Sequence, residues 1–365
     1  MSPQKSAKRI GPTNEGKALQ GTAGPALPDG QCRPPGGVTR SGAGGRQQGA
    51  ALLLAMLTVA LVATLASAAL WQQWRSAEVE AAERQRLQAS WILVGALDWA
   101  RLILREDARS NQNTGAADHL GEPWATPLEE ARLSSFLAAD KNNSAEELMP
   151  AFLSGEMIDQ QSRLNFRNLI RITGTGPQAK AELSAPDVAT FTRLYELLDL
   201  PPAELTAAAA NLLRTTERAL DDPKPSSSPL VPKRYAQLSW LGLSQASLTA
   251  LEKHVTVLPE STRLNLNTAS AEALSASVPG LDLAMAQQVL TSRASNPFTK
   301  LEDAVARIPG ATTETVTVAH HDVRSRFFEA RVRLRLDDTL IEEHSLIQRN
   351  GMTTLVQWRE RVAAP

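Results

Sequence analysis

Residues 50–70 read AALLLAMLTVALVATLASAAL, an uncharged run of 21 residues that begins directly after Gly49. A run of 18 or more apolar residues is typical of a membrane-spanning helix, and at about 1.5 Å per residue this one reaches about 31 Å, one hydrocarbon thickness. Trp71 and Trp74 follow, where interfacial aromatic residues are expected. A cleaved secretory signal has a shorter apolar core, and its small residue comes after that core. We therefore predict a membrane helix over residues 50–70.

The charges on either side of this run predict its orientation. Residues 1–48 carry seven basic and two acidic residues, which leaves 31 basic and 37 acidic residues in the remainder. Basic residues beside a membrane helix stay in the cytoplasm, so the part after residue 70 is expected to be exported. The only cysteine is Cys32, so that exported part forms no disulfides. Residues 1–48 have the composition of a disordered segment, and a mis-assigned start codon is an alternative explanation of their length.

A helical pattern continues beyond the apolar run. Residues 71–108 contain no proline and one glycine, and Leu87, Trp91, Val94 and Leu97 recur at helical spacing. The sequence therefore predicts one long helix whose outer half packs this apolar stripe against a globular part.

The C-terminal end has the pattern of β-strands. Apolar and charged residues alternate from Phe328 to Leu336, as in a strand with one buried face. Asp337-Asp338 predicts a turn before a second strand over residues 340–348. Asn350-Gly351 predicts a two-residue type I′ turn, which needs a positive φ at both positions, before a third strand. Residues 323–365 are thus expected to form an antiparallel meander.

The region between helix and meander is mainly helical. Two helices are predicted within residues 186–220, separated at Pro201-Pro202, and several short helices within residues 244–318. A Pro/Ser-rich loop is predicted at residues 221–233, and weaker strand patterns lie near 131–138 and 155–166. This order predicts an α+β fold in which a large all-α domain interrupts an antiparallel sheet.

Residues 264–310 resemble the helix-hairpin-helix modules of DNA-binding proteins, with Asn267 or Thr268 as the expected cap of the first helix. Such a module needs a Gly-apolar-Gly turn, so that backbone amides can approach a phosphate. Here Asp282 follows Gly280 and Leu281 and puts a negative charge at that place. Together with the acidic balance of the exported part, this predicts a structural module that does not bind nucleic acid.

Candidate metal and catalytic residues are few. Asp140, Asn142 and Ser144 have the spacing of the first calcium ligands of an EF-hand loop, but Ala145 and Ala151 replace its glycine and its bidentate glutamate. A capped turn is the simpler interpretation of this segment, and a calcium site of another type, completed by distant carboxylates, is the alternative. The five histidines lack zinc spacing, and the adjacent pair at 320 and 321 is expected at the surface. Nothing in the sequence indicates an enzyme.

Gly49 followed by an uncharged helix resembles the type IV prepilin leader, which prepilin peptidase cuts after glycine. The resemblance implies that Ala50 becomes the N-methylated new N-terminus. Filament-body subunits carry a glutamate at the fifth mature position, and here that position is Leu54. A missing glutamate is characteristic of the type II secretion minor pseudopilin K family.

Several further segments resemble the same family, in order along the chain: residues 98–107, 118–125, 158–169 and 264–269. The resemblance implies a pilin-like fold and a tip complex, formed with the I and J minor pseudopilins, that initiates and caps the pseudopilus. It also implies a bacterial inner-membrane protein with a periplasmic C-terminal part, possible contacts with the H and major pseudopilins, and a calcium site. The implied divisions are a removed cytoplasmic leader (1–49), an N-terminal helix (50–110), the first part of the α/β domain (111–167), the inserted α domain (168–322) and the meander (323–365).

Two other interpretations remain at this point. A membrane-anchored DNA-binding protein of the competence type would use residues 264–310. A signal-anchored periplasmic enzyme would need a nucleophile or base, and the sequence nominates none.

Overall fold

The computed structural model describes residues 47–114, 117–133, 151–175, 178–221, 230–336 and 339–362. The chain divides into two compact units, residues 1–73 and 74–365, and helix α1 (Gln47–Thr114) has residues in both. In the first unit, every described side chain from Ala50 onward is exposed. Within the described ranges, α1 is the one helix that is long and apolar enough to cross a membrane, judged by length and composition.

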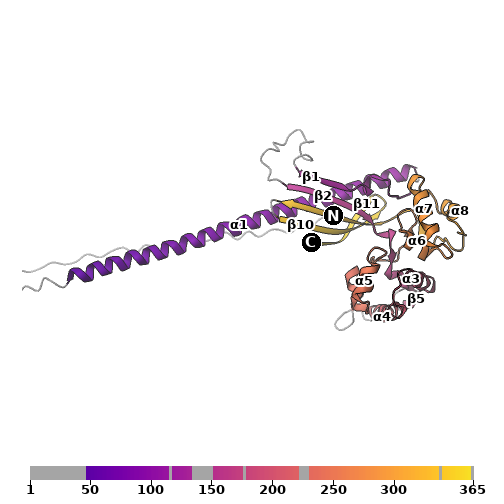
Figure 1. Cartoon of the computed structure of the whole chain (residues 1–365), viewed down its shortest axis with the longest axis horizontal. Coiled ribbons are helices and arrows are strands. Elements are labelled where there is room, and N and C mark those ends of the chain that lie inside the picture. The colour runs from indigo at the N-terminus through magenta and orange to yellow at the C-terminus, as the bar shows by residue number, and fades with distance from the viewer. Residues whose placement is uncertain are drawn as a thin grey trace, which may run out of the picture. The chain divides into compact units, whose positions relative to one another are not determined.

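The second unit contains a five-stranded antiparallel sheet with the order β1-β2-β9-β10-β11 (Figure 1). Its strands are β1 (Leu128–Arg132), β2 (Ala151–Asp159), β9 (Phe327–Leu336), β10 (Thr339–Asn350) and β11 (Thr353–Val362). The predicted α+β class is confirmed. The two early strands begin three to four residues before their predicted places, and the predicted turn at Asp337-Asp338 lies outside the described residues.

The face of α1 that packs on the sheet differs from the predicted one. Leu87 and Trp91 are 60% and 72% exposed, so the prediction that they pack against the globular part is wrong for these two of the four residues. The buried positions are Ala89, Leu93, Leu97, Ala100 and Leu104, which contact apolar side chains of β2, β9 and β10. These five positions recur every three or four residues along one side of the helix, which shares Leu97 with the predicted stripe but faces away from Leu87 and Trp91. Two of the five are alanines, which let the helix backbone approach the sheet.

The turn between β10 and β11 differs in type from the prediction. Asn350 pairs with Thr353, so the two loop residues are Gly351 and Met352. Gly351 has a φ of +58°, and Asn350 has no positive φ. A positive φ at the first loop residue alone is the type II′ pattern, in which glycine takes that place. The asparagine therefore ends the strand, and the predicted type I′ turn is wrong.

Residues 160–326 lie between β2 and β9 and form their own apolar core, together with Ala117. The helices are α3 (Ala185–Leu197), α4 (Pro202–Asp221), α5 (Gln245–Leu251), α6 (Ala271–Ser277), α7 (Leu283–Ser295) and α8 (Leu301–Arg307). The short 3-10 helices of the insertion are η3 (Gln160–Ser162), η4 (Phe166–Leu169) and η6 (Tyr235–Leu241), whereas η1 (Pro123–Ala125) lies before β1.

Short strands accompany the helices of this insertion. Three two-stranded ladders pair β3 (Leu164–Asn165) with β6 (Val255–Thr256), β4 (Ile170–Thr173) with β5 (Lys180–Leu183), and β7 (Leu264–Asn265) with β8 (His321–Asp322). The insertion is therefore mainly, but not entirely, helical.

The break between α3 and α4 follows from local chemistry. Helix α3 ends at Leu197, and α4 begins at Pro202, a position where the missing amide hydrogen of proline costs nothing. Between them Asp199 adopts a φ of +52°, the one positive φ of a non-glycine residue in the described chain. Within the predicted Pro/Ser-rich loop, residues 222–229 lie outside the described ranges.

Candidate functional site

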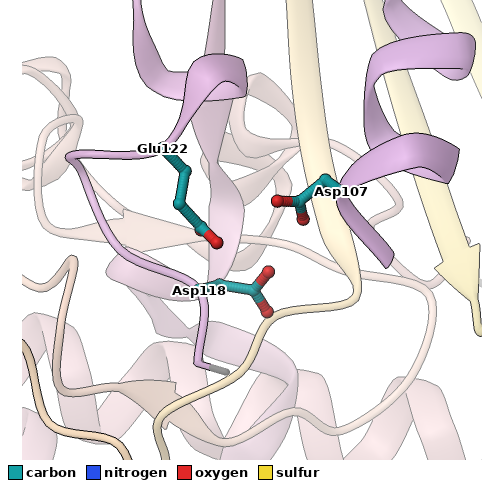
Figure 2. A group of neighbouring side chains, drawn as sticks. All are labelled: Asp107, Asp118 and Glu122. Atoms are coloured by element: carbon teal, nitrogen blue, oxygen red, sulfur yellow. The ribbon is translucent and has the colours of Figure 1, made fainter. Parts of the chain in front are cut away.

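Three carboxylates meet where the C-terminal end of α1 approaches the sheet. Asp107 comes from α1, and Asp118 and Glu122 come from the loop that follows it. Their ligand oxygens all lie within 4.8 Å of one another, and Figure 2 shows the three side chains pointing toward a common centre. Asp118 and Glu122 are buried, with 1% and 8% of their surface exposed. We call these three residues the acidic cluster.

Arg349, near the end of β10, supplies the positive charge of this cluster. Its Nη1 lies 2.5 Å from Asp107 Oδ2, and its Nη2 lies 2.5 Å from Asp118 Oδ1 and 2.8 Å from the carbonyl oxygen of Ser325. Burial, and then the nearby Glu122 carboxylate, raise the pKa of Asp107 to about 7, although Arg349 acts in the opposite direction. One guanidinium facing three carboxylates leaves the cluster short of positive charge whenever all three are ionised.

The acidic cluster has the ligand type of a calcium site. Calcium binds carboxylate and other oxygen ligands in flexible geometry, and this is the one group of three such residues within the described ranges. A cation would have to share Asp107 and Asp118 with Arg349. The sequence candidates Asp140, Asn142 and Ser144 lie outside the described residues, so the structure does not place them.

A second buried carboxylate joins the insertion to the sheet. Asp159, the last residue of β2, accepts hydrogen bonds from Asn265 Nδ2 at 3.1 Å, Thr268 Oγ1 at 2.6 Å and Ser325 Oγ at 2.6 Å. It also accepts one from the backbone N–H of Gln161 at 2.8 Å. Burial raises the pKa of Asp159 to about 6. Asn265 and Thr268, within residues 264–269 (LNLNTA), therefore connect the insertion to the sheet.

The cap of α6 is not one of the predicted residues. Ser270 accepts a hydrogen bond from the backbone N–H of Ala273 at 3.2 Å and is the N-cap. Asn267 instead accepts from the backbone N–H of Phe298 and donates to its carbonyl, and Thr268 donates to Asp159. Both predicted caps are wrong because their side chains already bind distant segments.

The hairpin turns show why this module differs from a DNA-binding one. Gly280, in the turn before α7, and Gly310, in the turn after α8, have φ values of +85° and +73°. The Asp282 carboxylate accepts a hydrogen bond from the backbone N–H of Met285 at 2.7 Å and caps α7. An anion from the chain itself therefore occupies the amides at the start of α7, and the competence-type interpretation is not supported.

The two adjacent histidines occupy different environments. His321 is 2% exposed and lies in β8, where burial lowers its pKa to about 4 and its Nδ1 accepts from the backbone N–H of Thr317. His320 is half-buried, with Nδ1 3.6 Å from Asp187 Oδ1. The surface prediction is therefore wrong for His321, because a short ladder takes it into the core of the insertion.

The residues predicted for processing and assembly lie in the first unit. Gly49, Ala50 and Leu54 belong to the first turns of α1, and the Leu54 side chain is 65% exposed. A Cβ at Gly49 would meet no atom within 4 Å. The role of each residue stays a prediction.

Comparison with known proteins gives consistent relatives. A family model described as type II secretion system (T2SS), protein K, matches residues 264–324. A type II secretion system protein K of Pseudomonas aeruginosa is 26% identical over 297 residues, with 80% of this chain and 86% of the relative covered. The protein K of Klebsiella pneumoniae is 27% identical over 329 residues, with 84% and 94% covered. The chain is thus similar to the type II secretion system protein K family over most of its length.

A solved structure agrees with the fold of this chain. The crystal structure of the GspK-GspI-GspJ complex from the enterotoxigenic Escherichia coli type 2 secretion system contains a chain that matches with a TM-score of 0.59. The match covers 78% of this chain and 99% of that chain at 17% identity. At this identity the similarity concerns the fold.

The segment that matches the protein K model also joins the insertion to the sheet, because it contains Asn265 and Thr268, which bond Asp159 of β2. The sequence singled out residues 264–269 (LNLNTA) as a segment, but it did not predict the bonds of Asn265 and Thr268 to Asp159. It missed the acidic cluster and Arg349. Their signal is weak, since single charges near element ends are common on protein surfaces and the partners are separated by up to 242 positions in the chain.

Proposed function

We propose that this chain is a minor pseudopilin that forms the tip complex of a type II secretion pseudopilus with the I and J minor pseudopilins. The observation that carries this proposal is the fold match to a chain of the GspK-GspI-GspJ complex, together with the K-family relatives. The complex would initiate pseudopilus assembly in the inner membrane and cap the filament. Its role is mechanical, so the chain acts as an assembly component and not as an enzyme.

The outer face of α1 offers a surface for such assembly. Leu87, Trp91, Trp99 and Leu102 are 38–72% exposed and lie opposite the face that contacts the sheet. Gly95 lies among them, and a Cβ there would meet no atom within 4 Å. We call these five residues the outer stripe. A contiguous exposed apolar surface marks an interaction site, and the matching α1 helices of neighbouring subunits are its natural partners.

Leu54 accounts for the place at the end of the filament. Cleavage after Gly49 would leave the amine of Ala50 as a positive charge inside the lipid, where an unpaired charge is costly. A glutamate at the fifth mature position would accept such an amine from a neighbouring subunit. The Leu54 side chain has no acceptor atom. The Ala50 amine of this subunit can therefore pair with the glutamate of a neighbour, but this subunit cannot bind the amine of another, as expected of the terminal subunit.

Calcium is proposed as the ion of the acidic cluster. Asp107, Asp118 and Glu122 would hold it, and it would supply the positive charge that Arg349 alone leaves unbalanced. Isothermal titration of calcium into the full chain should show binding that Glu122→Gln weakens by about tenfold or more. Unchanged binding in that variant would place calcium elsewhere.

Co-purification tests the assembly. Full-length chain co-expressed with tagged I and J pseudopilins should be recovered with both after detergent extraction. Recovery with neither partner, in the presence of calcium, would contradict the tip assignment. Processing at Gly49 is tested separately by the N-terminal mass of the chain with and without prepilin peptidase.

Leu54→Glu tests the position at the filament end. The variant gains an acceptor for a second amine, so pseudopili should lengthen beyond this subunit or its extraction from the membrane should slow. Leu53→Glu is the matched control, since it adds the same charge one residue earlier. Equal filament length and secretion in all three proteins would show that the charge argument is wrong.

A further inference from the structure

The insertion contains a groove of two adjoining lobes. The first lobe has a volume of about 760 Å³ and the second about 460 Å³. They share Asn168, Asp187, Thr262 and His320 among their lining residues, so they form one continuous depression. Neither lobe includes a residue of the acidic cluster or of the outer stripe. The groove is therefore separate from the surfaces assigned above.

Positive charge in the groove exceeds the negative charge available to pair with it. Its five lining arginines are Arg163, Arg167, Arg171, Arg193 and Arg263. Arg171 pairs with Glu182, and Arg263 pairs with Asp322. The other three have no carboxylate oxygen within 4.0 Å in the part of the chain that the structure describes. Arg193 is satisfied by the carbonyl oxygen of Ala276 at 2.7 Å.

The carboxylates of the groove are mostly engaged elsewhere. Besides Glu182, Asp187 accepts from Ser184 Oγ and faces His320, and Glu260 pairs with Arg326. Glu314 is exposed to solvent. Within the described residues, Arg163 and Arg167 are thus the two groove arginines whose side chains have neither a carboxylate within 4.0 Å nor a carbonyl partner.

Burial makes these two arginines costly in the free protein. Removal from water lowers the pKa of both Arg163 and Arg167, and for Arg167 burial is the only cause. A partly buried cation loses hydration. For Arg167 no neighbouring charge offsets this loss, whereas for Arg163 the carboxylates of Glu329 and Glu252 offset it in part from beyond 4.0 Å. A guanidinium presents a planar fork that fits a carboxylate with two hydrogen bonds, so an incoming carboxylate would restore what burial removed.

The walls of the groove point to a polypeptide ligand. Ile172 of β4 and Leu183 of β5 line the first lobe and are 46% and 42% exposed. A polypeptide could place a carboxylate at an arginine and cover the neighbouring Ile172 and Leu183 with an apolar side chain. A small free anion would leave these two apolar side chains exposed. Each arginine lies in a different lobe, so a ligand that reaches both must be extended.

We propose that this groove binds an extended acidic segment of another polypeptide, with its carboxylates at Arg163 and Arg167 and its apolar side chains against Ile172 and Leu183. Binding here does not depend on the assembly with the I and J pseudopilins. A variant that loses peptide binding in the groove can therefore be distinguished from one that loses assembly with the I and J pseudopilins.

Fluorescence anisotropy with the full-length chain in detergent tests this proposal. The probe is a labelled eight-residue peptide of alternating leucine and aspartate, and the reference peptide has asparagine in place of aspartate. The acidic peptide should bind about tenfold or more tightly than the reference, a difference of about 1.4 kcal/mol. The double variant Arg163→Gln/Arg167→Gln should remove this preference.

Arg214→Gln/Arg218→Gln is the matched control, because both residues are exposed on α4 and neither lines the groove. It should bind like the parent protein. The groove variant should also melt no lower than this control, since it breaks no ion pair. A markedly lower melting temperature would assign the two arginines a structural role and overturn the proposal.

Reversing the charge at Arg167 provides a second test, in which the expected result is a gain of binding to a basic peptide. Arg167→Glu should bind a peptide of alternating leucine and lysine that the parent protein does not bind. Equal binding of the acidic and amide peptides to the parent protein would contradict the proposal. Complete displacement of the acidic peptide by equimolar inorganic phosphate would indicate a small-anion site and also contradict it.

Discussion

Arg349 of β10 and Asp107 of α1 form a buried ion pair across 242 positions of sequence, with 2.5 Å between Nη1 and Oδ2. The same guanidinium bonds Asp118, and it lies over the ring of Phe328 with its Cζ 4.8 Å from the ring centroid. One side chain therefore connects the helix, the loop after it and two strands of the sheet.

Replacing Arg349 should destabilise the second unit strongly. Arg349→Met leaves Asp107 and Asp118 buried without a cation, which typically costs about 3–5 kcal/mol. Arg84→Met is the control, because its pair with Glu80 is exposed on both sides and contributes little. Urea unfolding followed by circular dichroism measures both. Equal midpoints for the two variants would show that the buried pair does not hold the fold.

Asp159 should make stability fall as pH rises. Its folded pKa of about 6 lies above the unfolded value of 3.8, so the folded state binds more protons between these values. This contribution is present below about pH 4 and is lost as pH approaches about 6, for a total of about 3 kcal/mol. Asp159→Asn should be less stable at pH 4, and its deficit should shrink by pH 7. A deficit that stays constant from pH 4 to pH 7 would contradict the raised pKa.

The outer stripe should matter for assembly and not for folding. Trp91→Ser should leave the unfolding midpoint unchanged, because the side chain is 72% exposed. A tryptophan at the centre of an interface contributes about 2 kcal/mol or more, so recovery with the I and J pseudopilins should fall sharply. Leu93→Ala, on the buried face, should instead cost about 2–5 kcal/mol of stability. Undiminished recovery of Trp91→Ser would exclude the stripe from the interface.

Asp282 should stabilise α7 as its cap. Asp282→Ala removes the acceptor of the Met285 N–H bond and should cost about 1 kcal/mol, whereas Asp282→Asn should retain most of it. Thermal unfolding of the three proteins provides the comparison. A gain of DNA binding by Asp282→Gly, which restores the glycine of the DNA-binding turn, would reveal a latent phosphate site, and we expect none.

The sequence predicted those parts of the fold that depend on local patterns. Alternation over Phe328–Leu336 and the Pro201-Pro202 break each reflect the backbone of a few neighbouring residues, and the structure contains the corresponding strand and helix boundary. Asp282 was also interpreted correctly as unfavourable for a phosphate, since its charge acts on the adjacent turn.

Features set by distant contacts were not predictable in this way. Leu87 and Trp91 are apolar like Leu93 and Leu104, and only the position of the sheet decides that the second pair is the buried one. Asn267 and Thr268 are good capping residues, but their bonds to Phe298 and Asp159 remove them from that role. The role of Arg349 as the partner of Asp107 and Asp118 depends on the strand pairing that places it beside the end of α1.

The pairing of Asp159 with Phe328 in the β2–β9 ladder has a consequence for how the chain folds. Every residue of the insertion lies between these two positions. Pairing of β2 with β9 therefore closes a long loop, which costs chain entropy. The insertion has a core of its own and returns its two ends to adjacent places. We therefore expect the middle of the chain to fold before the sheet that surrounds it in sequence, and hydrogen-exchange labelling during refolding should protect α6 before β9.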